Sequence, residues 1–244
     1  MKPFYLIQAN PQWEAPDANR DYLAALIENC RDGIVVLPEM FSTGFSMASK
    51  RLAETMAGET VSWMTIQAKR LQSVICGSQI IEAEGQYYNR FIWAEPDGSF
   101  RHYDKRHLFR MADEQKYYAA GQSRSVVEHG DLVVLPQICY DLRFPAWSRN
   151  TGNDFHAMIY VANWPAARRQ HWLTLLKARA IENICYVVAV NRVGVDGNDV
   201  AYDGDSCVID FRGETLLDLG SEEAVANCKL DIPALTAYRE AFPA

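Results

Sequence analysis

The sequence lacks the patterns that mark metal-binding, nucleic-acid-binding and membrane-spanning proteins. Its six cysteines are scattered, with no CxxC pair and no Cys–His spacing suited to zinc. It has no run of Lys or Arg, and its formal net charge of −7 argues against nucleic acid or an anionic membrane as a partner. Apolar runs are interrupted within about ten positions, which is too short to span a bilayer. We therefore expect no metal site, no nucleic-acid partner and no membrane association.

A secretory signal is also missing from the N-terminal stretch MKPFYLIQANPQWEAPD. Its apolar part is too short for the core of a signal peptide, and no small-residue cleavage site follows. This predicts a cytoplasmic protein whose six thiols are reduced. Most of them are expected to act as small apolar core residues, in particular Cys76, Cys185 and Cys207.

The chain is otherwise typical of a globular protein. Its 244 residues are 49% hydrophobic and 23% charged, and no linker or low-complexity tract divides them, so we expect one domain over 1–244. Helices are predicted from a cap at Asp17 to about 29, from a cap at Thr60 to 71, and over 169–183. Strands are predicted over 3–9, 34–38, 73–81, 86–95, 99–105, 131–139, 156–163, 185–194, in a hairpin over 206–220 that turns at Arg212-Gly213, and over 224–232.

Two features of this order indicate the fold class. Strands alternate with helices early and late in the chain, with hairpins between them, which predicts an α/β layered sandwich whose mixed sheets are buried under helices. Residues 105–125 are charged and aromatic without a clean period, which is typical of a long functional loop or an irregular helix.

Three ionisable residues lie at, or just beyond, the ends of predicted strands. Glu39 follows IVVLP, Lys105 follows SFRHYD, and Cys139 follows VVLPQI. Taken singly, each has an ordinary interpretation: a solvated loop carboxylate, an exposed charged turn and a core thiol. Strand ends on one edge of a sheet converge in space, however, and functional groups gather there. The shared position favours one site built from all three.

These three groups suit acyl transfer. A thiol becomes a nucleophile when a neighbouring base or cation favours the thiolate. Glu39 could take the proton and later return it to a leaving group, and Lys105 could stabilise an oxyanion. The backbone N–H of Tyr140, directly after the nucleophile, is a natural second oxyanion donor.

A Cys–His dyad is the alternative at this point. The sequence offers five histidines, and His107 is the one nearest Lys105. Its expected role is structural hydrogen bonding. Replacing each histidine by Gln would distinguish the two interpretations.

The motifs LPEMFSTGF (37–45), DKRHLF (104–109) and ICYDLRFP (138–145) resemble the nitrilase or carbon–nitrogen hydrolase superfamily in order, spacing and strand context. The resemblance covers essentially the whole chain. It implies a four-layer α-β-β-α sandwich that commonly forms homodimers. It also implies Glu39 as general base, Lys105 as oxyanion stabiliser and Cys139 as nucleophile, with Glu114 as a second glutamate that supports the lysine or the substrate. No metal or organic cofactor is implied.

Within the superfamily, MFSTGF and CYDLRFPAW most resemble the ω-amidase branch. Its members hydrolyse the terminal amide of 2-oxoglutaramate and related short ω-amido 2-oxo acids. The resemblance therefore implies an amidase that releases the acid and ammonia through a thioester on the cysteine.

A substrate carboxylate calls for a cation, ideally an arginine that pairs with both of its oxygens. Arg110, Arg143 and Arg168 are the candidates by position, although Arg143 is interpreted first as a structural salt-bridge residue and Arg168 as a solvated one. Aromatic residues near the motifs could form a pocket wall, although such residues more often lie in the core. The candidates are Phe41, Tyr117, Tyr118 and Trp164.

Other functions of the same fold remain open. Deaminated glutathione, N-carbamoyl compounds or nitriles would use the same three groups. A chain that has lost catalysis and serves as a scaffold is an alternative of another class, against which the intact Glu–Lys–Cys set argues.

Overall fold

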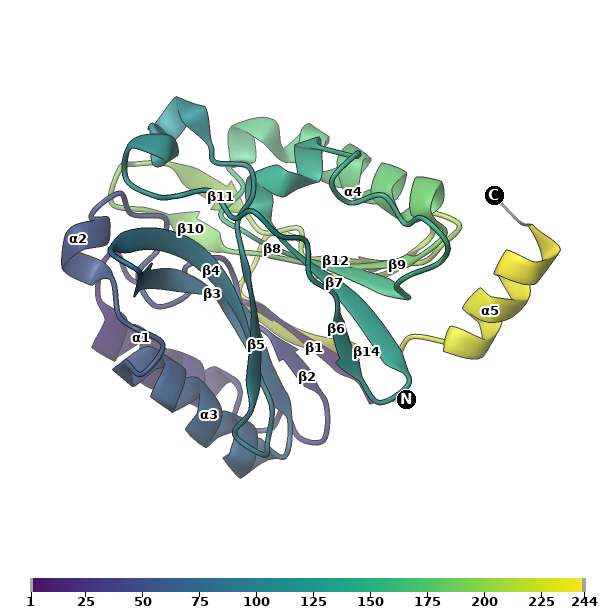
Figure 1. The fold of residues 1–244 in the computed structure, drawn as a ribbon, viewed down its shortest axis with the longest axis horizontal. Helices are drawn as coiled ribbons and strands as arrows, with labels where there is room; N and C mark the ends of the chain where they lie inside the picture. The colour runs from purple at the N-terminus through teal and green to yellow at the C-terminus, as the bar shows by residue number, and fades with distance from the viewer. Residues whose placement is uncertain (1, 243–244) are drawn as a thin grey trace.

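The computed structural model describes residues 2–242 and contains two six-stranded mixed sheets that pack face to face (Figure 1). The first sheet has the order β14-β1-β2-β3-β4-β5, with β1, β2 and β3 parallel and the other pairs antiparallel. Its strands are β1 (Phe4–Gln8), β2 (Ile34–Val36), β3 (Val74–Ala83), β4 (Gln86–Ala94), β5 (Phe100–Asp104) and β14 (Ala224–Cys228).

The second sheet has the order β13-β12-β9-β8-β7-β6, with β7, β8 and β9 parallel. Its strands are β6 (Val127–His129), β7 (Leu132–Ile138), β8 (Ala157–Ala162), β9 (Tyr186–Asn191), β12 (Cys207–Ile209) and β13 (Thr215–Asp218). A separate hairpin is formed by β10 (Val193–Val195) and β11 (Ala201–Asp203).

Helices cover the outer face of each sheet. The helices α1 (Pro16–Leu26) and α3 (Glu59–Leu71) pack on the first sheet, and α4 (Arg169–Asn183) packs on the second (Figure 1). The short α2 (Ser49–Leu52) lies at one end, and α5 (Ile232–Ala241) lies at the side of the molecule near its C-terminal end. The expected α-β-β-α sandwich is confirmed.

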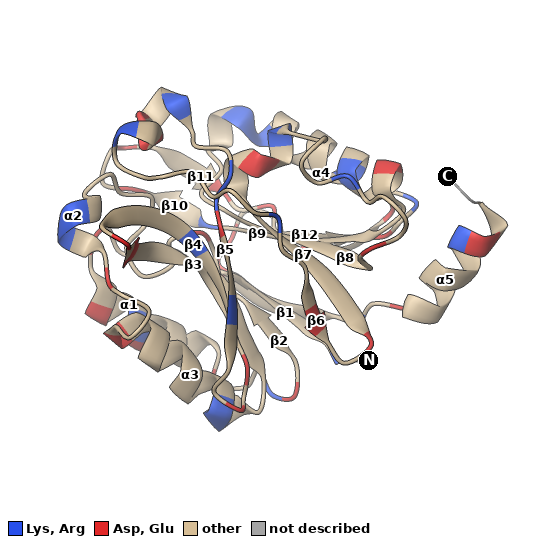
Figure 2. Cartoon of the chain, viewed as in Figure 1, with Lys and Arg blue, Asp and Glu red and all other residues tan. Residues whose placement is uncertain are grey.

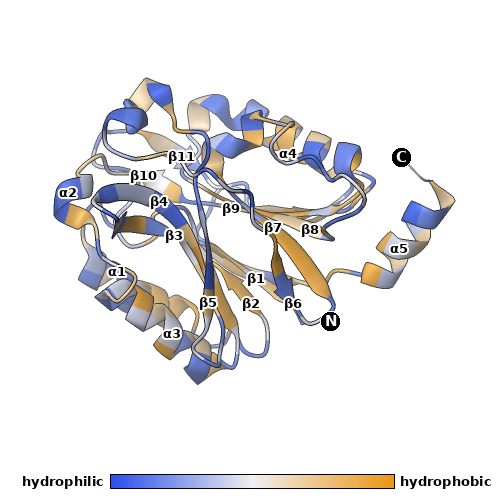
Figure 3. Ribbon diagram, viewed as in Figure 1, coloured by the Kyte–Doolittle hydropathy of each residue, from blue (hydrophilic) through white to orange (hydrophobic). Residues whose placement is uncertain are grey.

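The alternation of side chains along the strands explains these layers. In β1, Phe4 and Leu6 belong to the core between the sheets, whereas Ile7 belongs to the core beneath α1 and α3. Successive side chains of a strand point to opposite faces, so a strand that is apolar throughout has both faces covered. The middle of the sheets is accordingly apolar, β7 most clearly (Figure 3), and charged residues lie mainly on helices and loops (Figure 2).

Several local predictions were wrong. Helix α1 starts at Pro16, so Asp17 lies in its first turn and pairs with Arg20 instead of capping the helix. Helix α3 starts at Glu59, and Thr60 bonds Glu54 instead of capping. The strand expected over 185–194 is divided into β9 and β10, and the last strand ends at Cys228.

Other local predictions were confirmed. Residues 105–125 contain only two short 3₁₀ turns, η1 (Arg110–Ala112) and η2 (Glu114–Lys116). The hairpin turn at Arg212-Gly213 is present, with Gly213 at φ 86°. Among the helices of residues 2–242, none has the length and apolarity needed to cross a bilayer.

Candidate active site

The ends of β2, β5 and β7 bring Glu39, Lys105 and Cys139 together. The Lys105 ammonium Nζ lies 2.8 Å from Glu39 Oε1. Both of these charged groups lie close enough to Cys139 to shift the pKa of its thiol. Glu39 and Lys105 come from the first sheet and Cys139 from the second, so the site forms only where the two sheets meet.

Two turns with left-handed backbone direct Glu39 and Cys139 inward. Met40 has φ 45°, and its N–H donates to Ser78 Oγ (3.0 Å), which fixes the chain immediately after Glu39. Cys139 has φ 46° and starts a 3₁₀ turn, η3 (Cys139–Arg143). A non-glycine residue held in this conformation costs about 1–3 kcal/mol and is typical of functional sites.

The Glu39 carboxylate is held on both of its oxygens. Oε1 accepts from Lys105 Nζ and from Asn89 Nδ2 (2.7 Å), while Oε2 accepts from the backbone N–H of Asn163 (2.8 Å). The side chain of Asn163 also donates to the Glu39 backbone carbonyl (2.7 Å). The carboxylate is therefore oriented before any substrate arrives.

Glu114 completes this arrangement from the other side of the lysine. Both of its carboxylate oxygens lie 3.0 Å from Lys105 Nζ, and Oε2 also accepts from the N–H of Phe109 (2.5 Å). Side chains of Glu39, Lys105 and Glu114 all have 0% exposure. We call these three residues the buried cluster.

The electrostatics of the resting site follow from this burial. Burial raises the pKa of the Cys139 thiol well above its ordinary value, with Glu39 acting in the same direction and Lys105 against it. Burial lowers the pKa of Lys105, but the carboxylates of Glu114 and Glu39 outweigh it and hold that pKa above its ordinary value. Burial raises the pKa of Glu114, against the pull of Lys105. The resting site thus holds a protonated thiol beside an ammonium.

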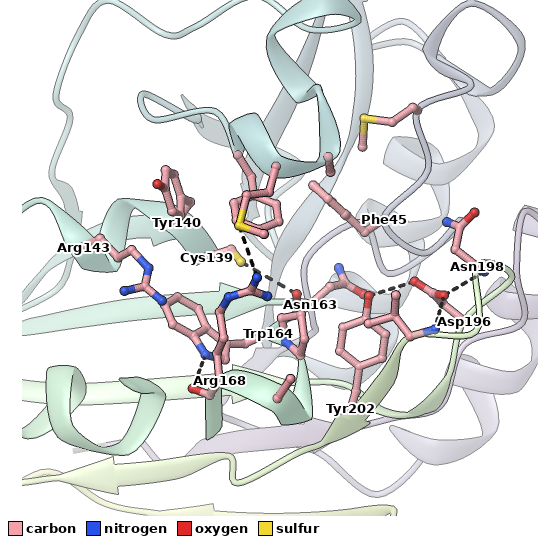
Figure 4. Close-up of a pocket in the computed structure, with 17 residues that line it drawn as sticks. Phe45, Cys139, Tyr140, Arg143, Asn163, Trp164, Arg168, Asp196, Asn198 and Tyr202 are labelled. Atoms are coloured by element: carbon pink, nitrogen blue, oxygen red, sulfur yellow. Dashed lines mark hydrogen bonds between the residues drawn. The ribbon is translucent and has the colours of Figure 1, made fainter. Parts of the chain in front are cut away.

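A cavity of about 580 Å³ opens onto this cluster at Cys139 (Figure 4). Cys139 is 9% exposed, whereas Lys105 and Glu39 are fully buried behind it. Phe45 lines the cavity, and the Lys105 Nζ lies over its ring, 5.0 Å from the ring centroid. Of the three predicted residues only Cys139 lines the cavity, as a nucleophile requires.

Two arginines line the cavity, and neither forms an ion pair with a carboxylate of residues 2–242; we call Arg143 and Arg168 the cavity arginines. Arg143 lies over the rings of Trp164 (4.9 Å) and Tyr140 (6.0 Å) and contacts His171 Nδ1 (2.9 Å). Within residues 2–242 no carboxylate lies within 4.0 Å of it, so its interpretation as a salt-bridge residue was wrong.

Arg168 is partly buried at the end of η4 (Ala166–Arg168), so it is not the fully solvated residue expected. Its guanidinium lies 5.6 Å from the Phe109 ring, and Nη2 lies 3.2 Å from Met111 Sδ. Arg110, the third candidate, is exposed and is not among the residues that line the cavity.

The predicted aromatic residues divide between cavity and core. Trp164 and Tyr140 line the cavity. Phe41 is buried against Trp63 beneath the helices, and Tyr118 packs with Met40, so the expectation that they contact substrate needs correction. Their side chains support the turn after Glu39 from behind.

Sequence reasoning missed the two asparagines that hold Glu39 and a cavity wall formed by the β10–β11 hairpin. Asn89 was recognisable as an amide inside an aromatic strand, and Asn163 as another polar residue at a strand end. The hairpin contributes Asp196, Asn198 and Tyr202, and the Tyr202 hydroxyl donates to Asp196 Oδ2 (2.8 Å).

The histidine alternative finds no support in the geometry. His107 stacks on Phe144, with ring centroids 3.7 Å apart, and bonds Asp141. In the part of the chain that the structure describes, no histidine ring is hydrogen-bonded to Cys139, and no group of three or more His, Cys, Asp or Glu side chains is arranged to hold a metal ion.

Comparison with known proteins identifies close relatives over nearly the whole chain. Residues 6–240 match the family model described as carbon-nitrogen hydrolase. The chain is 46% identical over 244 residues to Omega-amidase YafV of Escherichia coli strain K12, covering 98% of this chain and 93% of that protein. It is 34% identical over 214 residues to 2-oxoglutaramate amidase of Bacillus subtilis, covering 86% and 82%.

A solved structure agrees with the computed one. XC1258 from Xanthomonas campestris, described as a CN-hydrolase superfamily protein with an arsenic adduct in the active site, superimposes with a TM-score of 0.97 at 46% identity. The match covers 99% of this chain and 95% of that one.

Proposed function

The chain belongs to the carbon–nitrogen hydrolase family, and from that premise we propose that it is an ω-amidase that hydrolyses the terminal amide of 2-oxoglutaramate or a similar short ω-amido 2-oxo acid. The observation that carries this proposal is the buried Glu39–Lys105 ion pair, which acts electrostatically on Cys139, while Cys139 lines the cavity and the other two do not. This arrangement supplies a base, a cation and a nucleophile to one amide carbon.

In the first half of the reaction, Glu39 takes the Cys139 proton as the sulfur attacks the amide carbon. Lys105 and the backbone N–H of Tyr140 stabilise the oxyanion. Glu39 then gives its proton to the amide nitrogen, and ammonia leaves. The thiol needs Glu39 as base because burial holds the pKa of Cys139 well above its ordinary value.

In the second half, a water molecule enters in place of ammonia. Glu39 takes a proton from it while it attacks the thioester, and the same two donors stabilise the second oxyanion. Collapse expels the Cys139 sulfur, which recovers its proton, and the acid is released. Glu114 contacts Lys105 and not Cys139 in its hydrogen bonds, so its role is to hold the ammonium in place.

We assign the substrate carboxylate to Arg143. Its guanidinium is held by two aromatic rings, lines the cavity that contains Cys139 and has no acidic partner among the described residues. Pairing with a carboxylate in a partly enclosed site supplies roughly 1.5–3 kcal/mol. Arg168, Tyr140 and Trp164 complete the wall around that group.

The proposal includes the state of the protein in the cell. We propose a single-domain, cytoplasmic protein that forms a homodimer, because the family commonly dimerises and Ile181 on α4 and Phe242 beyond α5 are exposed. Light scattering at working concentration checks the dimer. A uniform 27.6 kDa species would contradict it.

Ammonia release from a set of substrates tests the function. The set contains 2-oxoglutaramate, glutamine, deaminated glutathione, simple nitriles and N-carbamoyl amino acids, each run beside Cys139→Ala. We expect 2-oxoglutaramate to give the highest kcat/KM. Preference for another member would reassign the substrate within the family, and release from none of them would favour a scaffold.

A further inference from the structure

Asp141 is a fully buried carboxylate that the reaction described above does not use. It lies two residues after Cys139 and is not among the residues lining the cavity. No Lys or Arg within residues 2–242 forms an ion pair with it. A buried carboxylate without such a cation is costly unless its oxygens accept hydrogen bonds.

Four hydrogen bonds satisfy those oxygens. Oδ2 accepts from the N–H of Ile138 (3.1 Å) and from the Tyr103 hydroxyl (2.8 Å). Oδ1 contacts the backbone N–H (2.9 Å) and ring Nδ1 (2.8 Å) of His107. Burial and Asp141 itself hold the pKa of Tyr103 well above its ordinary value, so the phenol keeps the proton that it donates.

The donors come from the two segments that carry the reacting groups. Tyr103 and His107 each lie two residues from Lys105, at the exit of the first sheet, and Ile138 directly precedes Cys139 at the exit of the second. The Asp141 side chain therefore links the chain segment that carries Lys105 to the one that carries Cys139, where the two sheets meet.

Asp141 also closes the strained turn at the nucleophile. Its bond to the N–H of Ile138 spans Cys139, whose φ of 46° is unfavourable for a residue with a side chain. The Asp141 carbonyl in turn accepts from the N–H of Phe144 (2.9 Å), which continues the turn. The conformation that exposes the sulfur thus depends on the same carboxylate.

We propose that Asp141 is a positioning residue that sets the separation of the Lys105 ammonium and the Cys139 sulfur. It acts by joining residues 103–107 to residues 138–141 and touches no substrate. The kinetic half of the test rests on the proposed function, whereas the thiol half does not.

Asp141→Asn is the direct test. Each oxygen accepts from at least one backbone N–H, of Ile138 or of His107, so whichever atom becomes –NH₂ faces a donor that it cannot pair with. A displacement of about 1 Å at a reacting group costs on the order of 100-fold, so we expect kcat for 2-oxoglutaramate to fall by about that factor with KM nearly unchanged. Loss confined to KM would overturn the proposal.

The rate of Cys139 alkylation by iodoacetamide, measured against pH, gives a readout independent of substrate. If Lys105 moves away from the sulfur, the apparent pKa of the thiol rises, and each unit slows alkylation about tenfold at a fixed pH below the pKa. Removing a negative charge without displacement would lower that pKa and speed alkylation. The direction of the change therefore separates positioning from simple charge removal, and an unchanged or faster rate overturns the proposal.

Glu54→Gln is the matched control. Glu54 also accepts two hydrogen bonds, from the N–H and hydroxyl of Thr60, but its carboxylate bonds the first turn of α3, and Glu54 does not line the cavity. The Glu54→Gln substitution should lower thermal stability and leave the rate of Cys139 alkylation unchanged.

If Asp141→Asn does not fold, the variants Tyr103→Phe and His107→Ala test the positioning role of Asp141 instead. Each removes one of the four bonds, and each should slow both reactions severalfold. Wild-type rates in both folded variants would overturn the proposal. If the wild type hydrolyses no amide, the function fails, but the alkylation series still decides the role of Asp141.

Discussion

The charged side chains beneath the cavity and those on its wall differ in their partners. In the buried cluster every charge has one: Lys105 lies between Glu39 and Glu114, and none of the three is exposed. The cavity arginines are partly exposed and rest on aromatic rings and a thioether, and no carboxylate among the described residues pairs with them. The reacting groups are thus fixed in advance, while the recognition groups keep their pairing capacity for the ligand.

Removing the sulfur of Cys139 should have the largest effect on activity. Cys139→Ala leaves the buried cluster and the cavity arginines intact but provides no nucleophile. We expect kcat to fall by at least about 10⁴-fold, as for nucleophiles of other hydrolases, with unfolding temperature nearly unchanged. Ammonia release and thermal melting measure this, and residual activity above one part in a hundred would argue against a thioester.

Removing the cation of the buried cluster should have the next largest effect on kcat, and it should also lower stability. Lys105→Met removes the oxyanion donor and leaves two carboxylates facing each other without a cation. We expect kcat to fall by about 10²–10³-fold and the free energy of unfolding to fall by about 3–5 kcal/mol. Single-turnover kinetics and urea unfolding check both, and lost activity at full stability would mean that the cluster is not held together by its charges.

Changing a cavity arginine should affect binding and not chemistry. Arg143→Met should raise KM for 2-oxoglutaramate by roughly 10–100-fold at similar kcat, because the lost pairing is worth about 1.5–3 kcal/mol. Arg168→Met is the matched comparison, with a smaller rise expected. A fall in kcat without a rise in KM, in either variant, would contradict the division between cluster and cavity wall.

The smallest expected effect is on the pH dependence of stability, and it follows from the burial of one core thiol, Cys207. Burial raises the pKa of Cys207 to about 12, above the ordinary thiol value near 8.5 that applies in the unfolded chain. The folded state therefore retains a proton that the unfolded state loses, and stability declines from about pH 8.5 upward, by about 1.4 kcal/mol per pH unit for this group. Cys207→Ala should flatten the decline in urea unfolding at pH 9–11. The partly exposed Cys228→Ala should flatten it less, and equal slopes would contradict the assignment to burial.

The residues of the site that could be predicted from the sequence are those that lie in or beside a recognisable local pattern. Glu39, Lys105 and Cys139 each follow a recognisable strand, and three ordered motifs gave both the family and the sandwich. Arg143 and Trp164 lie close to those motifs in sequence and also line the cavity. Short-range signals were sufficient for these residues.

Long-range contacts could not be predicted in this way. Asn89 on β4 and Asn163 just beyond β8 bond Glu39 from 50 and 124 residues away, and no local pattern in the sequence predicts those contacts. Phe41 was misassigned because its side chain points to the opposite side of the turn from Glu39, beneath the helices. Asp17 and Thr60 were misassigned as caps because Pro16 and the Glu54 carboxylate determine those helix starts.

The pairing of β1 with β14 has a consequence for how the chain is made. Phe4 lies opposite Cys228, so β1 is synthesised long before β14, the strand that pairs with its outer edge. Until then, β1 presents a free edge of backbone donors and acceptors to any other extended chain. Nascent chains stalled before residue 224 should accordingly need chaperone protection that the finished protein does not.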